Sequence, residues 1–383
     1  MLSVGVVIVL RVRDIRSDRQ AVGLVTTAAV RAAVAWSQRQ AHPAAWRELS
    51  RMTGVVVHAL GPMHTPLEPT RLIELLHGPL SALVGSGSPV SEVVLLEPDG
   101  EVADAAIDIA CEYAEALFEN SSDPARTWLP SWTWQRREQV ERSVYEGLIA
   151  NGDQRAYEAT RRFLIEHPVG DARSLVQLRN EAGARNVAEY SPIGPDRTWP
   201  GGGSAYWWPC PICRWPMRVK PPLVACDFRH HDARFRLVTP ARHDDRPSLV
   251  ALTVERLNTP VAVAADGSVC LAPSVWRHVT VPGISELATE TALEEIKGVH
   301  VEMWLGLDAI DLLVQVGGRK LEVDIKDRVD PIMIAEDAPT AQHIVVPDYR
   351  RAQLPILRDL LSDKHIWTIR EFVKYVRKQG DSR

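Results

Sequence analysis

Two aspartates and a lysine near the C-terminus have the types and the spacing of a site for a divalent cation. Asp311 and Asp324 lie in apolar runs on either side of Gly317 and Gly318, and paired glycines between such runs predict a tight β-hairpin. In that hairpin Asp311 faces Asp324, and Lys326 points to the same side of the sheet. Like charges so placed repel unless a cation lies between them, so the three side chains indicate a site for Mg²⁺ or Mn²⁺.

This set of residues has a definite chemistry. Two carboxylates can hold Mg²⁺, and a lysine can orient or deprotonate an attacking water and offset phosphate charge. The competing interpretation is an ordinary solvated strand face. The apolar residues of both strands require burial on at least one side of the sheet, which favours the metal site over that alternative.

A second candidate metal site lies in the middle of the chain. Cys210 and Cys213 form a C-x-x-C pair, and Cys226 follows after twelve residues. Thiolates and an imidazole at this spacing can close a tetrahedral structural Zn²⁺ site, for which we choose His230 as the fourth ligand. The alternatives for that position are His231, Cys270 and His243.

Basic residues gather around the cysteines. Residues 214–246 contain only four acidic residues. A basic element stabilised by zinc is a candidate contact for a phosphate backbone, and a solvated face is an equally good explanation. The basic residues are Arg214, Arg218, Lys220, Arg229, Arg234, Arg236, Arg242 and Arg246.

Composition limits the class of protein. The chain has 383 residues, enough for two or three domains, and its formal net charge of −5 means that any affinity for nucleic acid must come from local basic clusters. Five cysteines with one C-x-x-C pair fit a reducing cytosol and a metal site. The apolar run Val4–Leu10 is too short for a membrane span and predicts a strand, so we expect a cytoplasmic protein without a membrane partner.

The chain is expected to divide into three parts. Residues 1–190 are predicted to be mainly α-helical, 191–247 to be a linker with the zinc element, and 248–383 to be an α/β domain. The N-terminal helices are predicted at Gly23–Gln38, Arg71–Val84, Glu101–Glu119, Gln135–Ala150 and Asp153–Glu166, with a short strand at Val93–Leu96. The C-terminal part is predicted to run through a helix at Ser285–Lys297, a strand at Val299–Leu305, the hairpin, a strand at His343–Pro347, a helix at Arg350–Leu361, a strand at His365–Ile369 and a basic helix at Arg370–Lys378.

The hairpin motif resembles the PD-(D/E)xK restriction-endonuclease superfamily, since I-D-L-L-V carries Asp311 and V-D-I-K carries Asp324 and Lys326. The resemblance implies a C-terminal αβββαβα core in a multidomain α/β chain. It also implies an additional glutamate from the helix before the first strand, for which Glu286 matches best and Glu290 second. The Ile325 carbonyl would be a further ligand. The triplet D-I-K departs from the commoner E-x-K but is an accepted variant in the superfamily, and because aspartate is one methylene shorter a different metal geometry is expected.

The order of motifs narrows the resemblance. R-R-F-L-I-E-H-P-V (Arg161–Val169) is followed by W-W-P-C-P-I-C-R-W-P-M and then by D-x12-D-I-K. In this order the chain resembles the restriction-endonuclease subunit associated with prokaryotic PIWI-RE proteins. That resemblance implies an antiviral defence role with a PIWI-RE protein and a helicase as partners. Its substrate would be DNA, with an RNA–DNA hybrid or an R-loop as alternatives.

Two functions therefore compete. The first is a Mg²⁺-dependent DNA endonuclease in which Asp311, Asp324 and Glu286 hold the metal and Lys326 positions water. The second is a catalytically weak scaffold, stabilised by zinc, that binds nucleic acid or a partner protein. Only the first requires the carboxylates and the lysine to act on one metal.

Overall fold

The computed structural model describes residues 19–61, 67–103, 105–110, 112–114, 117, 127–133, 137–149, 152–201, 203–239, 246–252, 257–337 and 339–380. These residues form two compact units, Met1–Trp134 and Gln135–Arg383. The predicted strand at Val4–Leu10 lies outside the described residues. The described part of the chain contains no helix with the length and hydropathy that a membrane span requires. The three-part division at residues 190 and 247 stays a prediction.

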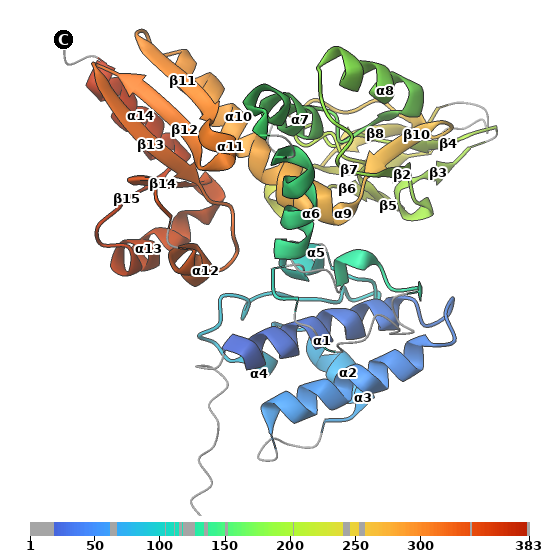
Figure 1. The fold of residues 1–383 in the computed structure, drawn as a ribbon. Coiled ribbons are helices and arrows are strands. Elements are labelled where there is room, and N and C mark those ends of the chain that lie inside the picture. The colour runs from blue at the N-terminus through green and yellow to red at the C-terminus, as the bar shows by residue number, and fades with distance from the viewer. Residues whose placement is uncertain are drawn as a thin grey trace, which may run out of the picture. The chain divides into compact units, whose positions relative to one another are not determined.

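Unit 1 is helical (Figure 1). Its elements are α1 (Arg19–Ser37), α2 (Ala45–Leu60), α3 (Pro69–Leu76), α4 (Ser81–Val84), α5 (Ala105–Ala110) and the 3₁₀ turn η3 (Ser131–Thr133). The single predicted helix Arg71–Val84 is divided into α3 and α4, because Pro79 interrupts it and forms a β-bridge with Val94. The predicted helix Glu101–Glu119 is wrong outside α5 among the described residues, because Val102 pairs with Leu96 in a second bridge.

Unit 2 begins with two helices and continues through short sheets into a larger one (Figure 1). Its first elements are α6 (Arg137–Ile149), α7 (Gln154–Glu166), β1 (Val169–Asp171), α8 (Ala172–Glu181), β2 (Tyr190–Pro192), η5 (Pro195–Arg197), β3 (Trp199–Pro200), β4 (Ala205–Trp207), β5 (Arg218–Lys220), β6 (Leu223–Ala225), η6 (Arg229–His231), β7 (Arg234–Val238), β8 (Ser248–Ala251), β9 (Val263–Ala264) and β10 (Ser268–Leu271). The small sheets have the strand orders β1-β10-β2, β3-β4-β9 and β5-β6-β7-β8.

The C-terminal elements form a five-stranded sheet in the order β11-β12-β13-β14-β15 with its helices. They are α9 (Pro273–Val275), the π-helix η7 (Trp276–Thr280), α10 (Val281–Glu294), β11 (Val299–Trp304), α11 (Leu305–Asp308), β12 (Ile310–Val316), β13 (Arg319–Ile325), α12 (Pro331–Glu336), β14 (His343–Val346), η8 (Asp348–Gln353), α13 (Leu354–Leu360), β15 (His365–Thr368) and α14 (Ile369–Gly380). The first three strands are antiparallel and the last two pair in parallel. A mainly helical N-terminal region and a C-terminal sheet core are thus confirmed.

Strands β12 and β13 form the predicted hairpin. Leu312 pairs with Val323, so the register places the neighbouring Asp311 and Asp324 opposite each other. Both glycines of the turn have positive φ, 58° and 78°, as a type I′ turn requires. The carboxylate-bearing ends of both strands therefore lie at the same edge of the sheet, away from the turn.

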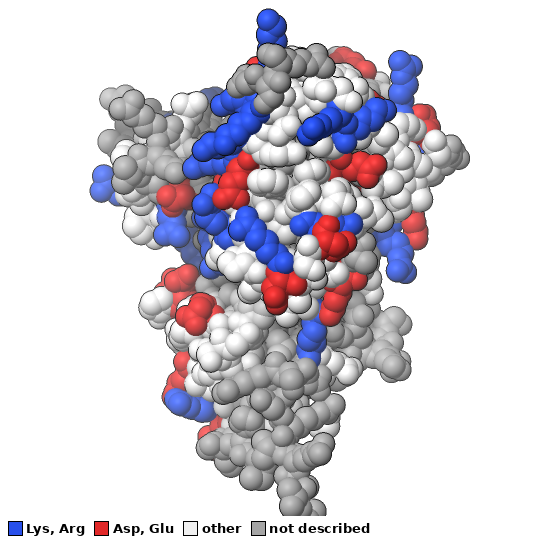
Figure 2. Space-filling model, turned by 90° about the vertical axis from the view of Figure 1, so that its left-hand side faces the viewer, with Lys and Arg blue, Asp and Glu red and all other residues white. Residues whose placement is uncertain are grey.

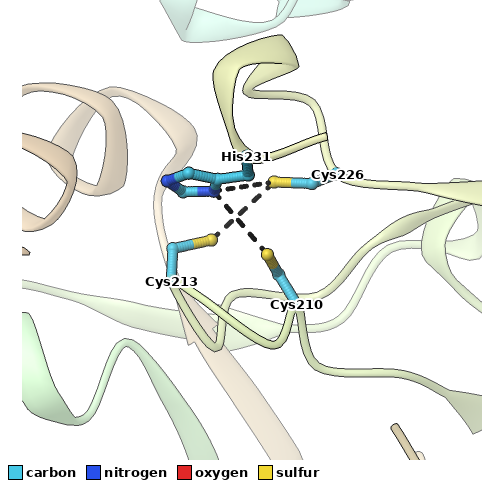
Figure 3. A group of neighbouring side chains, drawn as sticks. All are labelled: Cys210, Cys213, Cys226 and His231. Carbon is cyan, nitrogen blue, oxygen red and sulfur yellow. Dashed lines mark hydrogen bonds between the residues drawn. The ribbon is translucent and has the colours of Figure 1, made fainter. Parts of the chain in front are cut away.

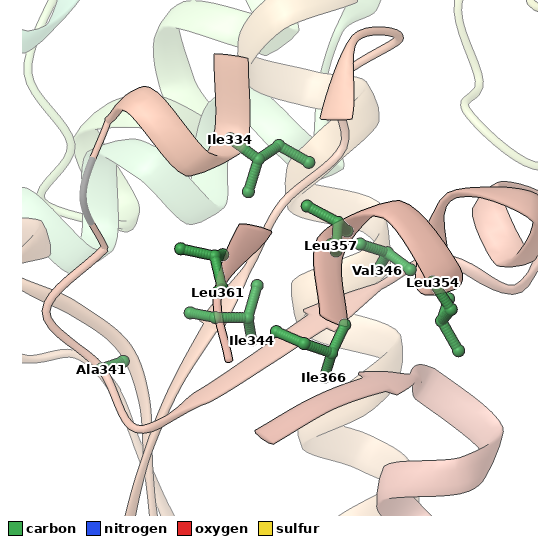
Figure 4. Packing of buried hydrophobic residues seen from close by; sticks show 8 residues of the cluster. All are labelled: Ile334, Ala341, Ile344, Val346, Leu354, Leu357, Leu361 and Ile366. Atoms are coloured by element: carbon green, nitrogen blue, oxygen red, sulfur yellow. The ribbon is translucent and has the colours of Figure 1, made fainter. Parts of the chain in front are cut away.

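Helices cover both faces of this sheet. Helices α10 and α14 pack on one face, where Phe372 and Val376 of α14 are buried. On the other face a buried aliphatic cluster joins α12 and α13 to β14 and β15 (Figure 4). Its members are Ile334, Ala341, Ile344, Val346, Leu354, Leu357, Leu361 and Ile366. Burial of such side chains stabilises the fold by roughly 1.5–3 kcal/mol each, which makes the sheet a rigid support for residues at its edge.

Candidate functional site

Three cysteines and one histidine converge between β4 and β7. Cys210 and Cys213 lie in a tight turn, in which the Arg214 amide donates to the Cys210 carbonyl at 2.8 Å and Arg214 has a φ of 61°. Cys226 directly follows β6, and His231 ends the 3₁₀ turn η6. All four side chains are buried and point toward one another (Figure 3).

The spacing of the four side chains fits a tetrahedral metal. His231 Nδ1 lies 3.6 Å from Cys210 Sγ and 3.4 Å from Cys226 Sγ, and Cys213 Sγ lies 3.8 Å from Cys226 Sγ. Zn–S and Zn–N bonds of about 2.3 and 2.0 Å give tetrahedron edges of about 3.5–3.8 Å, which matches these distances. Burial raises the pKa of the Cys213 and Cys226 thiols well above the usual value, and a bound Zn²⁺ would offset this cost by stabilising the thiolates.

The fourth member of the cluster is His231, which corrects our choice of His230. The two histidines are consecutive in η6, so their side chains leave the turn in different directions. The ring of His230 stacks on Tyr349 at 4.4 Å between centroids instead. Cys270 lies on β10 and is not part of the cluster, and His243 lies outside the described residues.

The basic residues around this cluster have different structural roles. Arg218 is mostly buried and pairs with the buried Asp227 at 2.9 Å, so it is a structural residue and does not offer its charge to solvent. Arg214 is exposed and donates to the Glu166 carbonyl, at the end of α7. Arg234 and Arg236 are exposed on β7. Arg242 lies outside the described residues. In Figure 2, Lys and Arg side chains are interspersed with Asp and Glu on the face shown.

The hairpin aspartates lie at the second candidate site. The Asp311 carboxylate accepts a hydrogen bond from the Ile325 amide at 2.6 Å, and Lys326 Nζ lies 3.5 Å from Asp324 Oδ2. Asp311 and Lys326 line a cavity of about 390 Å³. The walls of the cavity come from α6, α7, η7, α10, α11, β12, β13 and α12.

Glu286 lines the same cavity but is held by other residues. Arg161 Nη2 donates to both of its carboxylate oxygens, at 2.8 and 2.9 Å, and Trp304 Nε1 donates to Oε2 at 2.6 Å. Arg161 also pairs with Asp308 at 2.5 Å. Glu290, the second choice from sequence, pairs with Arg162 at 3.0 Å.

The segment between β11 and β12 brings Asp308 to this cavity through an uncommon backbone. Trp304, Leu307 and Asp308 have φ of 50°, 59° and 80°, a left-handed conformation that costs free energy in residues with a Cβ. Gln154 of α7 holds this segment, since it donates to the Trp304 carbonyl at 2.8 Å and accepts from the Leu307 amide at 2.9 Å. Helix α7 thus holds in place the backbone segment that leads to Asp311.

Burial and mutual repulsion determine the charge state of the carboxyl groups. Burial raises the pKa of Asp311 well above its usual range, although Lys326 opposes the change. Burial also raises the pKa of Glu286 despite the adjacent Arg161. Burial lowers the pKa of Lys326, but Asp311 and Asp324 outweigh it and the net direction is upward. A cation in the cavity would stabilise the ionised form of these carboxyl groups.

The carboxyl groups do not form a ready-made metal site. Within the described ranges, the three cysteines with His231 are the only group of three or more possible ligands that lie close enough to share an ion. Sequence reasoning also missed Arg161 and Asp308. Asp308 stands three residues before Asp311, which is a usable signal, whereas nothing in the sequence connects Arg161 to a residue 125 positions away.

Two protein families match the chain. Residues 283–383 match the family described as "REase associating with pPIWI_RE", and residues 21–171 match "pPIWI_RE three-gene island domain Y". The resemblance to a restriction-endonuclease-like protein tied to PIWI-RE systems, which the motifs indicated, is therefore confirmed by matches to these two segments. The domain Y match ends at β1, so α6 and α7 of unit 2 belong to it. No curated protein and no solved structure matches the chain significantly.

Proposed function

We propose that the chain is a metal-dependent endonuclease that hydrolyses DNA phosphodiester bonds in a prokaryotic defence system. Its partners there would be a PIWI-RE protein and a helicase. The observation that carries the proposal is the convergence of carboxyl groups and a lysine on one cavity. Glu286, Asp308 and Asp311 line the cavity together with Lys326, and Lys326 Nζ lies 3.5 Å from Asp324 Oδ2. A divalent cation bound there would stabilise the ionised form of Asp311 and Glu286, whose pKa burial raises.

Each residue has a role in this proposal. Asp311 and Asp324 would hold Mg²⁺ or Mn²⁺, because hard divalent cations prefer carboxylate oxygens. Lys326, held near Asp324, would orient the attacking water and offset charge on the phosphate. Bound Mg²⁺ would supply Lewis-acid activation of the phosphodiester. Glu286 could join the metal ligands only after its contact with Arg161 is released, because that contact engages both of its oxygens.

The Cys₃His cluster would hold a structural Zn²⁺. Three thiolates and an imidazole are the ligands of closed structural zinc sites, and all four are buried, which leaves no open position for a substrate. Zinc would therefore stabilise the fold between β4 and β7 and take no part in hydrolysis.

The test is cleavage of DNA by variants of the hairpin. Asp324→Asn and Lys326→Met should each reduce Mg²⁺-dependent cleavage at least about a hundredfold, measured with the partner proteins present. Glu322→Gln is the matched control, because Glu322 is an exposed acidic residue on the same strand. Full cleavage by Asp324→Asn with an intact fold would refute the proposal.

One observation favours the second candidate, a scaffold without strong nuclease activity. Arg161 forms ion pairs with both Glu286 and Asp308, and if these pairs persist, too few carboxylates remain to bind a metal. A scaffold would retain DNA or partner binding in Asp324→Asn and would show no cleavage in the parent protein. The same assay therefore separates the two functions.

A further inference from the structure

Residues next to the Cys₃His cluster pack against Tyr349 of η8, which in turn contacts the residue that follows Lys326. His230, next in sequence to the cluster member His231, stacks on Tyr349 of η8 with 4.4 Å between centroids and 13° between ring planes. Phe228 meets both the His231 ring, at 4.8 Å, and the Tyr349 ring, at 5.6 Å, edge to face. Aromatic pairs with these geometries attract each other beyond simple burial, so η6 and η8 are held together where the cluster ends.

Tyr349 extends this contact to Asp327, two residues after the end of β13. Its hydroxyl donates to Asp327 Oδ2 at 2.8 Å, and Arg350 Nε donates to Oδ1 at 3.0 Å. The Asp327 side chain is completely buried and directly follows Lys326 in the chain. A buried carboxylate is stable only while its hydrogen bonds are kept, so Asp327 cannot leave this position cheaply.

The structure assigns to Tyr349 and Asp327 the role of positioning residues through which the Cys₃His element fixes Lys326. The inference rests on the proposed function for the role of Lys326 and of zinc. In this arrangement η6 presents His230 to Tyr349, Tyr349 holds Asp327, and zinc at the neighbouring cluster would order η6. The Lys326 amide donates to the Val345 carbonyl at 2.8 Å, so with Asp327 fixed the backbone on both sides of Lys326 is held.

The effect of zinc loss should be local, because other contacts hold the segment after β13 in place. Gln353 donates to the carbonyls of Arg328 and Val329 at 2.9 and 2.8 Å, through hydrogen bonds that do not involve the Tyr349 side chain. The guanidinium of Arg277 lies over the Phe228 ring at 5.0 Å and 3.8 Å from Asp327, which forms a second bridge between the two elements. Removal of zinc should therefore loosen residues 326–329 without unfolding the sheet.

Hydrogen exchange of the full chain tests the coupling without any use of nuclease activity. Extraction of zinc by a chelator should speed amide exchange at residues 326–329 by about tenfold or more and leave β15 unchanged. Tyr349→Phe keeps the stack on His230 but loses the hydroxyl, so it should speed exchange at 326–329 with zinc still bound. Zinc extraction from Tyr349→Phe should then add less than it does in the parent chain.

Two control variants separate this coupling from general loosening. Tyr206→Phe makes the same chemical change on β4, and His300→Ala removes a histidine from β11, so neither should alter exchange at 326–329. His230→Ala should retain zinc and still speed that exchange, whereas His230→Phe should restore the stack and the protection. Unchanged exchange at 326–329 after zinc loss, with faster exchange at 226–233, would overturn the inference.

Cleavage kinetics provide a second measurement. A positioning role predicts that Tyr349→Phe lowers kcat severalfold with little change in KM, since the contacts that bind DNA remain. A change confined to KM would contradict it. If the parent chain cleaves no DNA, the proposed nuclease function fails, while the exchange experiment still decides whether the zinc element and residues 326–329 are coupled.

Discussion

Arg161 and Glu286 form a bidentate pair that joins the two family segments of the chain, with Nη2 at 2.8 and 2.9 Å from the carboxylate oxygens. Arg161 lies in the segment that matches domain Y, and Glu286 lies in the segment that matches the associated endonuclease domain. Helix α7 of domain Y therefore forms one wall of the cavity that contains Asp311. The endonuclease-like domain has its candidate site only together with the end of domain Y.

Loss of Arg161 should destabilise unit 2 in a way that divalent cations correct. Arg161→Met leaves the carboxylates of Glu286 and Asp308 without their cation, and breaking a buried pair costs about 3–5 kcal/mol. Mn²⁺ or Mg²⁺ should then raise the melting temperature of this variant more than that of the parent. Arg162→Met is the control, because Arg162 is 40% exposed and should cost less than about 1 kcal/mol. Equal metal responses in all three proteins would contradict a cation site at the carboxyl groups of this cavity, on which the proposed function rests.

Zinc content should distinguish the two neighbouring histidines. We expect about one zinc per chain, lost on His231→Ala and retained on His230→Ala, because only His231 reaches the thiols. His231→Ala should also lower the melting temperature, since the energy of binding structural zinc contributes to folding. Metal analysis of protein purified without chelators measures the zinc content, and thermal unfolding measures the melting temperature. Zinc that survives His231→Ala but disappears with His230→Ala would restore the ligand that we chose from sequence.

The sequence was sufficient for features that depend on local geometry. Paired glycines require a tight turn, and the turn sets the register that opposes Asp311 to Asp324. The choice between His230 and His231 depends on how a single 3₁₀ turn is rotated, which spacing does not determine. The contact of Arg161 with Glu286 depends on how α7 packs on α10, and no periodicity carries that information.

Acid should weaken the C-terminal sheet through His343. Burial, with a smaller contribution from His365, lowers the pKa of His343 to about 4, and the ring accepts a hydrogen bond from Trp367 Nε1 at 3.2 Å. The folded pKa lies below the unfolded value of about 6.5, so the unfolded chain binds the proton first. Stability should therefore be fully present above pH 6.5 and fall toward pH 4, by at most about 1.4 kcal/mol per pH unit from this group.

The variant His343→Asn isolates this contribution. Its side-chain oxygen can accept from Trp367 and does not titrate, so the dependence of the free energy of unfolding on pH between 6.5 and 4 should become flatter. His300→Asn is the matched control on β11, where the histidine is exposed. Denaturant unfolding at several pH values gives the slopes. The same slope in His343→Asn and the parent would show that other groups cause the acid sensitivity.

The exposed arginines of β7 should provide part of any attraction to DNA. The chain carries −5 overall, so binding to a polyanion requires local basic residues. Arg218 is excluded from that role by its pairing with buried Asp227, and its replacement would test stability instead. Arg234 and Arg236 are exposed and alternate with the buried residues of the strand, so both point away from the core.

Arg234→Gln with Arg236→Gln should weaken DNA binding equally for all sequences and flatten its dependence on salt. Each phosphate contact on duplex DNA contributes about −0.9 to the slope of log K against log salt concentration, so the pair should flatten it by up to about 1.8. Arg173→Gln with Arg179→Gln on α8 removes the same charge elsewhere and should change the slope less. Titration of labelled DNA at several salt concentrations measures these slopes. An unchanged slope would make the β7 face an ordinary solvated surface and direct the search to Lys374 and Arg377, which are exposed on α14.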